Sequence, residues 1–109
     1  MKKDNSNIVN INLDRQQIVN YVNEASLTCY GVKEVLSIPH KKGKKELAIY
    51  VHFEHENTFS LDIHVIIAKD VKVTETIRSL QKTIRYYMNR LYPRMCKKIN
   101  IYAEGISLE

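Results

Sequence analysis

The residues of this chain that could do chemistry begin with two histidines and a carboxylate in its middle third. His52, Asp62 and His64 fall on two neighbouring runs of alternating residues, and the alternation puts all three on the same side. Two imidazoles and a carboxylate can hold zinc. A flat sheet face rarely converges three ligands on one point, however, and no HxxxH or HxH spacing accompanies them. We therefore interpret them as part of a polar sheet surface, and predict no metal and no cofactor.

The two cysteines offer little support for thiol chemistry. Cys29 lies on the apolar stripe of an expected helix, which favours a structural thiol over a nucleophile. Cys96 lies among Arg94, Lys97 and Lys98, a basic setting that could lower its pKa, but no base with an orienting partner accompanies it. The sequence also lacks a glycine-rich phosphate loop and the GxSxG, HExxH and CxxC motifs. We predict that the protein is not an enzyme.

Two groups of cations could bind an anion. One is the stretch HKKGKK at residues 40–45, and the other is a row at i, i+4 and i+7 on the outer side of an expected helix. Their members are Lys41, Lys42, Lys44 and Lys45 in the first group, and Arg78, Lys82 and Arg85 in the second. Either group could contact phosphates of RNA, DNA or lipid, although a charge run is more often a solvated surface. The net charge of +5 permits an anionic partner without identifying one.

The stretch from Glu46 to Ala68 must position most of these side chains, and it organises the chain. It contains two alternating runs rich in β-branched and aromatic residues, joined by a short polar break, which is typical of a hairpin of half-buried strands. A three-residue turn at 56–58 predicts that His52 faces Asp62 on the outer side, one pair along from Tyr50 and His64.

The remaining elements surround this hairpin. In chain order we expect a strand at 9–13, a helix between the N-cap Asp14 and Gly31, a strand at 32–38, the hairpin, a helix over 73–91 and a closing strand at 99–104. Each helix has a single apolar stripe, so both should pack on the same face of the sheet. The sequence predicts an α+β, two-layer fold with the order β-α-β-β-β-α-β and a mostly antiparallel sheet.

The other face of that sheet is the expected binding surface. It would carry a row of aromatic, apolar and imidazole side chains: Tyr50, His52, His64, Ile66 and Tyr102. Exposed patches of this kind often mark docking surfaces, although tyrosine and isoleucine are also good strand formers. A sheet covered on one side leaves the other available for a protein partner or a second copy of the chain.

The pattern as a whole resembles the alkaline shock protein 23 family, also called the Gls-type envelope stress response family. The resemblance covers about residues 8–106, and its most specific part is INIYAEGI at 99–106, which is similar to the family's closing V-N-V-x-V-x-G-[IV]. The strand LDIHVII at 61–67 and the helix that starts at Val73 also match in hydrophobic pattern. LSIP at 36–39 replaces a glycine-rich stretch usual in the family, which marks a divergent member.

The resemblance implies a non-catalytic, cytoplasmic interaction module that supports envelope stress response or homeostasis, sometimes held at the membrane by an anchored partner. In addition, no apolar run in the sequence reaches the ~20 residues of a membrane span, and the first residues lack the pattern of a signal peptide. We expect a frayed segment at 1–7, one domain over 8–109, and a protein partner or homo-oligomer. An RNA- or ribosome-associated domain is the alternative.

Overall fold

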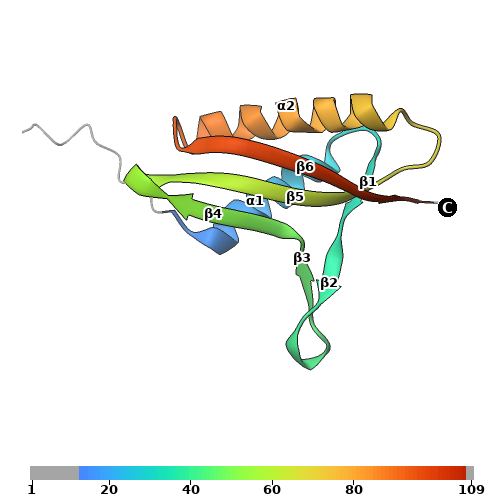
Figure 1. Cartoon of the computed structure of the whole chain (residues 1–109), viewed down its shortest axis with the longest axis horizontal. Helices are drawn as coiled ribbons and strands as arrows, with labels where there is room; N and C mark the ends of the chain where they lie inside the picture. The colour runs from blue at the N-terminus through green and yellow to red at the C-terminus, as the bar shows by residue number, and fades with distance from the viewer. Residues whose placement is uncertain (1–12, 108–109) are drawn as a thin grey trace, which may run out of the picture.

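The computed structural model describes residues 13–107, which form a layer of two helices on a β-sheet (Figure 1). The elements in chain order are α1 (Arg15–Leu27), β1 (Val32–Val35), β2 (Ser37–Pro39), β3 (Lys45–Leu47), β4 (Ile49–Glu54), β5 (Thr58–Ile67), α2 (Val73–Leu91) and β6 (Cys96–Ile106). Short 3-10 turns, η2 (Lys41–Gly43) and η3 (His55–Asn57), close the two hairpins. The α+β class and the mostly antiparallel sheet predicted from the sequence are confirmed.

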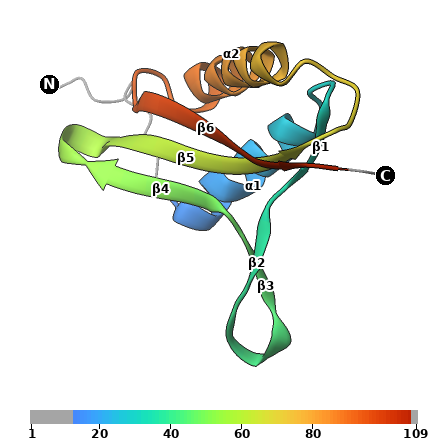
Figure 2. The same cartoon turned by 45° about the vertical axis from the view of Figure 1, so that its right-hand side comes forward.

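Strand β5 is the centre of the main sheet. It pairs antiparallel with β4 along its first half and with β1 along its last three residues, and it pairs parallel with β6 along its other edge. Strands β2 and β3 pair only with each other and form an arm that projects away from the sheet (Figures 1 and 2). The crossover from β5 to the parallel β6 is made by α2, as parallel neighbours require.

The hairpin turn begins one residue earlier than predicted. The loop is His55–Asn57 and not 56–58, and its last two residues, Glu56 and Asn57, have φ of 61° and 57°. Asparagine tolerates this left-handed region, whereas the predicted turn would place the β-branched Thr58 there.

This earlier turn changes the partners across the hairpin but not the faces. Val51 lies opposite Leu61 and His52 lies opposite Ser60, so each partner differs by two residues from the predicted one. Because side chains alternate with a period of two, a shift of two leaves every residue on its predicted side. Asp62 lies opposite Tyr50 in the ladder and is diagonal to His52.

Other boundaries also differ from the expected ones. The closing strand β6 runs over Cys96–Ile106 instead of 99–104, and the first run of the expected hairpin is divided between β3 and β4. Helix α1 ends at Leu27, before Gly31, because the hydroxyl and the amide of Thr28 both bond the Ala25 carbonyl. The strand expected at 32–38 is divided at Leu36, since β4 already occupies the neighbouring part of β5. Leu13 precedes α1 outside any strand, and the rest of the strand expected at 9–13 lies outside the described residues.

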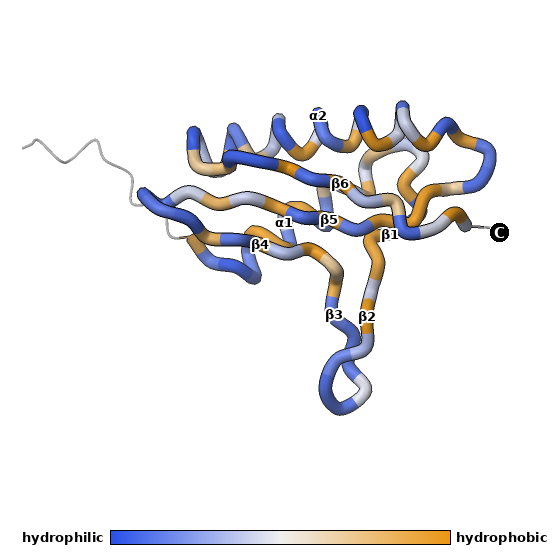
Figure 3. Tube along the Cα trace, in the orientation of Figure 1, coloured by the Kyte–Doolittle hydropathy of each residue, from blue (hydrophilic) through white to orange (hydrophobic). Residues whose placement is uncertain are grey.

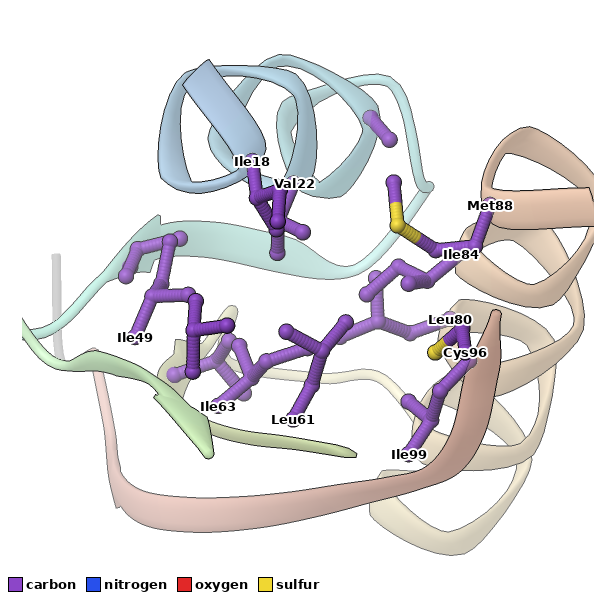
Figure 4. Close-up of a cluster of buried hydrophobic side chains, with 14 of the residues drawn as sticks. Ile18, Val22, Ile49, Leu61, Ile63, Leu80, Ile84, Met88, Cys96 and Ile99 are labelled. Atoms are coloured by element: carbon purple, nitrogen blue, oxygen red, sulfur yellow. The ribbon is translucent and has the colours of Figure 1, made fainter. Parts of the chain in front are cut away.

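The core lies between the helices and one face of the sheet. Apolar residues alternate along the strands and recur along the helices on the sides that meet there (Figure 3). Figure 4 shows fully buried side chains of this core: Ile18 and Val22 of α1, Leu80, Ile84 and Met88 of α2, and Leu61 and Ile63 of β5. Val65 of β5 is also fully buried. Burial of each such side chain contributes about 1.5–3 kcal/mol. Because both helices share this core, they lie on the same face, as predicted.

Candidate functional site

The face of the sheet that points away from the helices carries the row of residues predicted to bind a partner. We call it the open face, since no described element covers it. Tyr50 of β4 and Tyr102 of β6 are 39% and 44% exposed, and His52 is also exposed. His64 and Ile66 of β5 are half-buried between the flanking strands.

Three of these side chains form an aromatic row across the sheet. The His64 ring stacks on Tyr102 with centroids 4.8 Å apart and an angle of 19° between the planes. Tyr50 meets the same imidazole edge-on at 5.6 Å. Such ring pairs contribute about 0.5–1.5 kcal/mol beyond their buried area, so His64 is held between its two neighbours.

The other two predicted residues lie beside this row. His52 is joined to the cluster through Asp62, whose Oδ2 is 2.8 Å from the histidine Nε2. Ile66 lies towards the end of β5, beside Gly105, where a Cβ would come within 3.6 Å of the isoleucine Cδ1.

Two further polar residues, which the sequence did not single out, complete the cluster. Asn100 donates from Nδ2 to Oδ1 of Asp62 at 2.9 Å, and Glu104 bonds Nδ1 of His64. The Asn100 hydrogen bond, followed by hydrogen bonding and attraction to His52, lowers the pKa of Asp62 against an opposing effect of burial. The signal for both residues is the parallel register of β6 with β5, which places Asn100 opposite Asp62. Local sequence patterns do not specify this pairing, because it depends on the order of the strands in the sheet.

Glu104 reaches His64 because of an irregularity in the strand pairing. Ala103 pairs with Val65 and Gly105 pairs with Ile66, so Glu104 is an extra residue in β6. A bulge of this kind re-aims the side chain that it carries. The result is two histidine–carboxylate pairs, side by side on the open face.

The lysines predicted to bind anions are spread over the arm. Lys41, Lys42, Lys44 and Lys45 are exposed at or near its tip, and the neighbouring His40 pairs with Glu46 at 3.3 Å. In both views the arm points away from α2 (Figures 1 and 2). The two basic groups of the sequence therefore do not combine into one surface.

The second basic group instead joins residues from the closing strand. A groove of about 450 Å³ lies between α2 and the start of β6, and five cations line it: Arg78, Lys82, Arg85, Lys97 and Lys98. Arg85 donates to the carbonyls of Cys96 at 2.6 Å and Lys97 at 3.2 Å, and Gln81 donates to Ile99 at 2.6 Å. The sequence predicted no anion-binding role for Lys97 and Lys98.

The Cys96 thiol is not activated by this basic setting. It is the first residue of β6 and is 5% exposed, and burial raises its pKa to about 11 despite the opposing effect of Arg85. The suggestion that neighbouring cations lower this pKa is wrong, because desolvation of the thiolate is the larger effect. Cys29 is buried as expected, with Sγ 3.7 Å from the Ser79 hydroxyl.

Comparison with known proteins gives a fold but no family. No family model and no curated protein matches the sequence. Solved structures do match: the MamM CTD E289D manganese form has a TM-score of 0.60 at 14% identity, covering 84% of this chain and 99% of that one. The MamM CTD W247A structure has a TM-score of 0.62 at 14% identity, with 89% and 86% covered. The MamM CTD E289H nickel form has a TM-score of 0.55 at 13% identity, covering 83% of this chain and 96% of that one.

The chain has the fold of these domains. This finding corrects the resemblance to the alkaline shock protein 23 family, since the neighbours in structure are MamM CTD structures. The segment at 99–106 that suggested the family is the half-buried edge strand β6, and its alternation reports burial on one side. The expected role in envelope stress depended on that resemblance and is therefore unsupported.

Within the part of the chain that the structure describes, two negative findings bear on function. No helix is long and apolar enough to cross a membrane. No three of the described histidine, cysteine, aspartate and glutamate side chains are grouped so as to hold a metal ion.

Proposed function

We propose that this chain is a non-catalytic interaction domain that self-associates through the open face of its sheet. The observation that carries the proposal is the aromatic row of Tyr50, His64 and Tyr102, whose two tyrosines are exposed, on a face that no described element covers. Partly exposed tyrosines supply a large contact area at a small cost in side-chain entropy, and they are enriched at interfaces.

The chemistry of this face suits a second copy of the same chain. A two-fold interface brings one patch against itself, so the patch must be self-complementary. The open face offers imidazoles at His52 and His64 and carboxylates at Asp62 and Glu104, which are donors and acceptors for the same groups on a partner copy. The planar rings beside them can pack against their own counterparts.

The test compares two double variants with the same change in chemistry. Tyr50→Lys with Tyr102→Lys adds two charges to the open face, and Tyr30→Lys with Tyr86→Lys adds them at exposed tyrosines elsewhere. Sedimentation or light scattering across a concentration series should show a dimer for the natural chain and the control pair, and a monomer for the open-face pair. A natural chain that stays monomeric at every concentration would rule the proposal out.

A second candidate function is binding of a divalent cation across such a dimer. The observation that favours it is the adjacent pairs His64–Glu104 and His52–Asp62, whose nitrogen and oxygen donors suit manganese, nickel or zinc. One copy of the described chain supplies too few grouped ligands, so the partner copy would have to supply the others. Two of the similar structures are described as manganese and nickel forms.

This candidate can be tested separately from self-association. Isothermal titration with manganese or nickel should show fewer than one ion per chain, and His64→Ala should abolish the binding. His40→Ala removes another histidine that pairs with a carboxylate, away from the open face, and should leave the titration unchanged. Equal binding by both variants would contradict the assignment.

A further inference from the structure

We propose that the groove between α2 and β6 binds the phosphate backbone of a nucleic acid. It borders the open face at Asn100, but none of its five cations belongs to the open-face cluster, so the proposal does not depend on the proposed self-association. The groove is lined by five cations and by the polar side chains of Gln81 and Asn100. No carboxylate of the described residues lies within salt-bridge distance of these cations.

The cations form a short linear array from two elements. Arg78, Lys82 and Arg85 lie along the segment 78–85 of α2, which is about 10 Å long. Lys97 and Lys98 follow the opposite wall of the groove on β6. Duplex nucleic acid carries one negative charge per about 1.7 Å of its axis, so an array of this length meets several phosphates at once.

One of the five cations is fixed in place. The guanidinium of Arg85 is anchored on the carbonyls of Cys96 and Lys97, which sets its orientation towards the groove wall. An anchored guanidinium loses less side-chain entropy when it contacts a phosphate than a freely rotating one does. The bond to the Lys97 carbonyl also joins the main chain of β6 to the helical row.

The lining favours phosphates over other anionic partners. No aromatic ring lines the groove, so it offers no stacking platform for the bases of a single strand. Its one apolar lining residue, Ile99, is 4% exposed, which leaves no apolar side chain to enter a membrane surface.

An acidic peptide that adds as a strand is also disfavoured. The carbonyls of Cys96, Lys97 and Ile99 along this part of β6 already accept hydrogen bonds from Arg85 and Gln81. A peptide that extends the sheet needs such main-chain groups to be available.

The experiment measures binding of a fluorescently labelled RNA duplex of about 16 base pairs by anisotropy, at about 50 mM and about 200 mM salt. The groove variant is Arg78→Gln, Lys82→Gln and Lys97→Gln, which spares the anchored Arg85. The matched control is Lys41→Gln, Lys44→Gln and Lys45→Gln on the arm, with the same change in net charge.

We expect the natural chain and the arm variant to bind the duplex with affinity that falls steeply with salt. The groove variant should bind at least tenfold more weakly at the lower salt, and its logarithmic salt slope should be smaller by about two to three. Equal losses in the two variants would show an effect of net charge alone and overturn the proposal. Absence of binding by the natural chain, or groove-dependent binding to vesicles with anionic lipid in place of RNA, would overturn it as well.

Discussion

The hydroxyl of Tyr92 is a polar group that the fold buries without a partner among the described residues. The side chain is 3% exposed and packs edge-on against Phe59, with ring centroids 5.5 Å apart, and against Tyr21 at 6.3 Å. Burial raises the pKa of this hydroxyl, because the surrounding side chains solvate the phenolate poorly. The ring therefore contributes to the core while the oxygen destabilises it.

We expect Tyr92→Phe to raise the free energy of unfolding by about 1 kcal/mol, because it keeps the ring contacts and removes the unsatisfied hydroxyl. Chemical denaturation followed by circular dichroism measures the difference. Tyr86→Phe, at an exposed ring, is the control and should change the stability by less than about 0.5 kcal/mol. A clear loss of stability in Tyr92→Phe would mean that the hydroxyl has a partner.

Asp62 gives the open face a defined dependence on pH. Its pKa lies below the ordinary value of 3.8, first because of Asn100 and then because of His52. A carboxyl with a lowered folded-state pKa adds stability above its unfolded pKa, and that stability is lost as the pH falls through the lowered value. Asp62→Asn should therefore be less stable than the natural chain at about pH 6, and the gap should close towards about pH 3.

Denaturation at several pH values measures this gap, and Glu24→Gln on α1 is the control. Glu24 has no ion pair among the described residues, so its variant should follow the natural chain throughout. A gap that widens on acidification would reverse the sign and contradict the assignment.

At the scale of elements, Gly31 lets the connection after α1 approach α2. Its φ of +96° is a conformation that other residues rarely adopt, and a Cβ there would lie 2.7 Å from the Thr76 hydroxyl oxygen. We expect Gly31→Ala to destabilise the fold by about 1–3 kcal/mol through strain and overlap together. Gly43→Ala on the arm has strain at φ +75° but open space around it, so its smaller loss isolates the contribution of crowding.

The elements themselves could largely be predicted from the sequence, since hydrophobic periodicity reports burial directly. The two helices, the β4–β5 hairpin and the shared helix face followed from this signal. Hydrophobic periodicity did not predict the hairpin register, because the register depends on whether Asn57 or Thr58 takes the left-handed position. The division of the strand at Leu36 could not be predicted either, because it results from competition between β1 and β4 for one edge of β5.

For the candidate sites, too, local patterns predicted some residues, and others depended on contacts between distant segments. Tyr50, His64 and Tyr102 were assigned to one face by alternation alone. Glu104 and Asn100 depend on the parallel pairing of two strands separated by a whole helix, which no local pattern encodes. Hydrophobic alternation also suggested the wrong family, because many two-layer folds share it.

At the scale of the whole molecule, the arm projects from the sheet, and Leu47 at its base packs against the core. Its strands β2 and β3 pair only with each other, and η2 at its tip is exposed. Replacing residues 39–45 with Asn-Gly would join Ile38 and Glu46, which are already opposite each other, by a favoured two-residue turn.

We expect this shortened chain to keep the far-ultraviolet spectrum of the natural chain and to lose less than about 1 kcal/mol of stability, since no core residue is removed. Its self-association should also be unchanged if the open face is the interface. Thermal denaturation and sedimentation measure the two properties. Unfolding of the shortened chain would show that the arm contributes to the fold.

The position of β5 between strands that precede it and one that follows it has a consequence during synthesis. When α2 has left the ribosome and β6 has not, the nascent chain already contains β1, β4 and β5, while one full edge of β5 has no neighbour. An unpaired apolar strand edge invites pairing with other chains. Translation speed over the last described strand should therefore influence how much of this protein reaches the folded state.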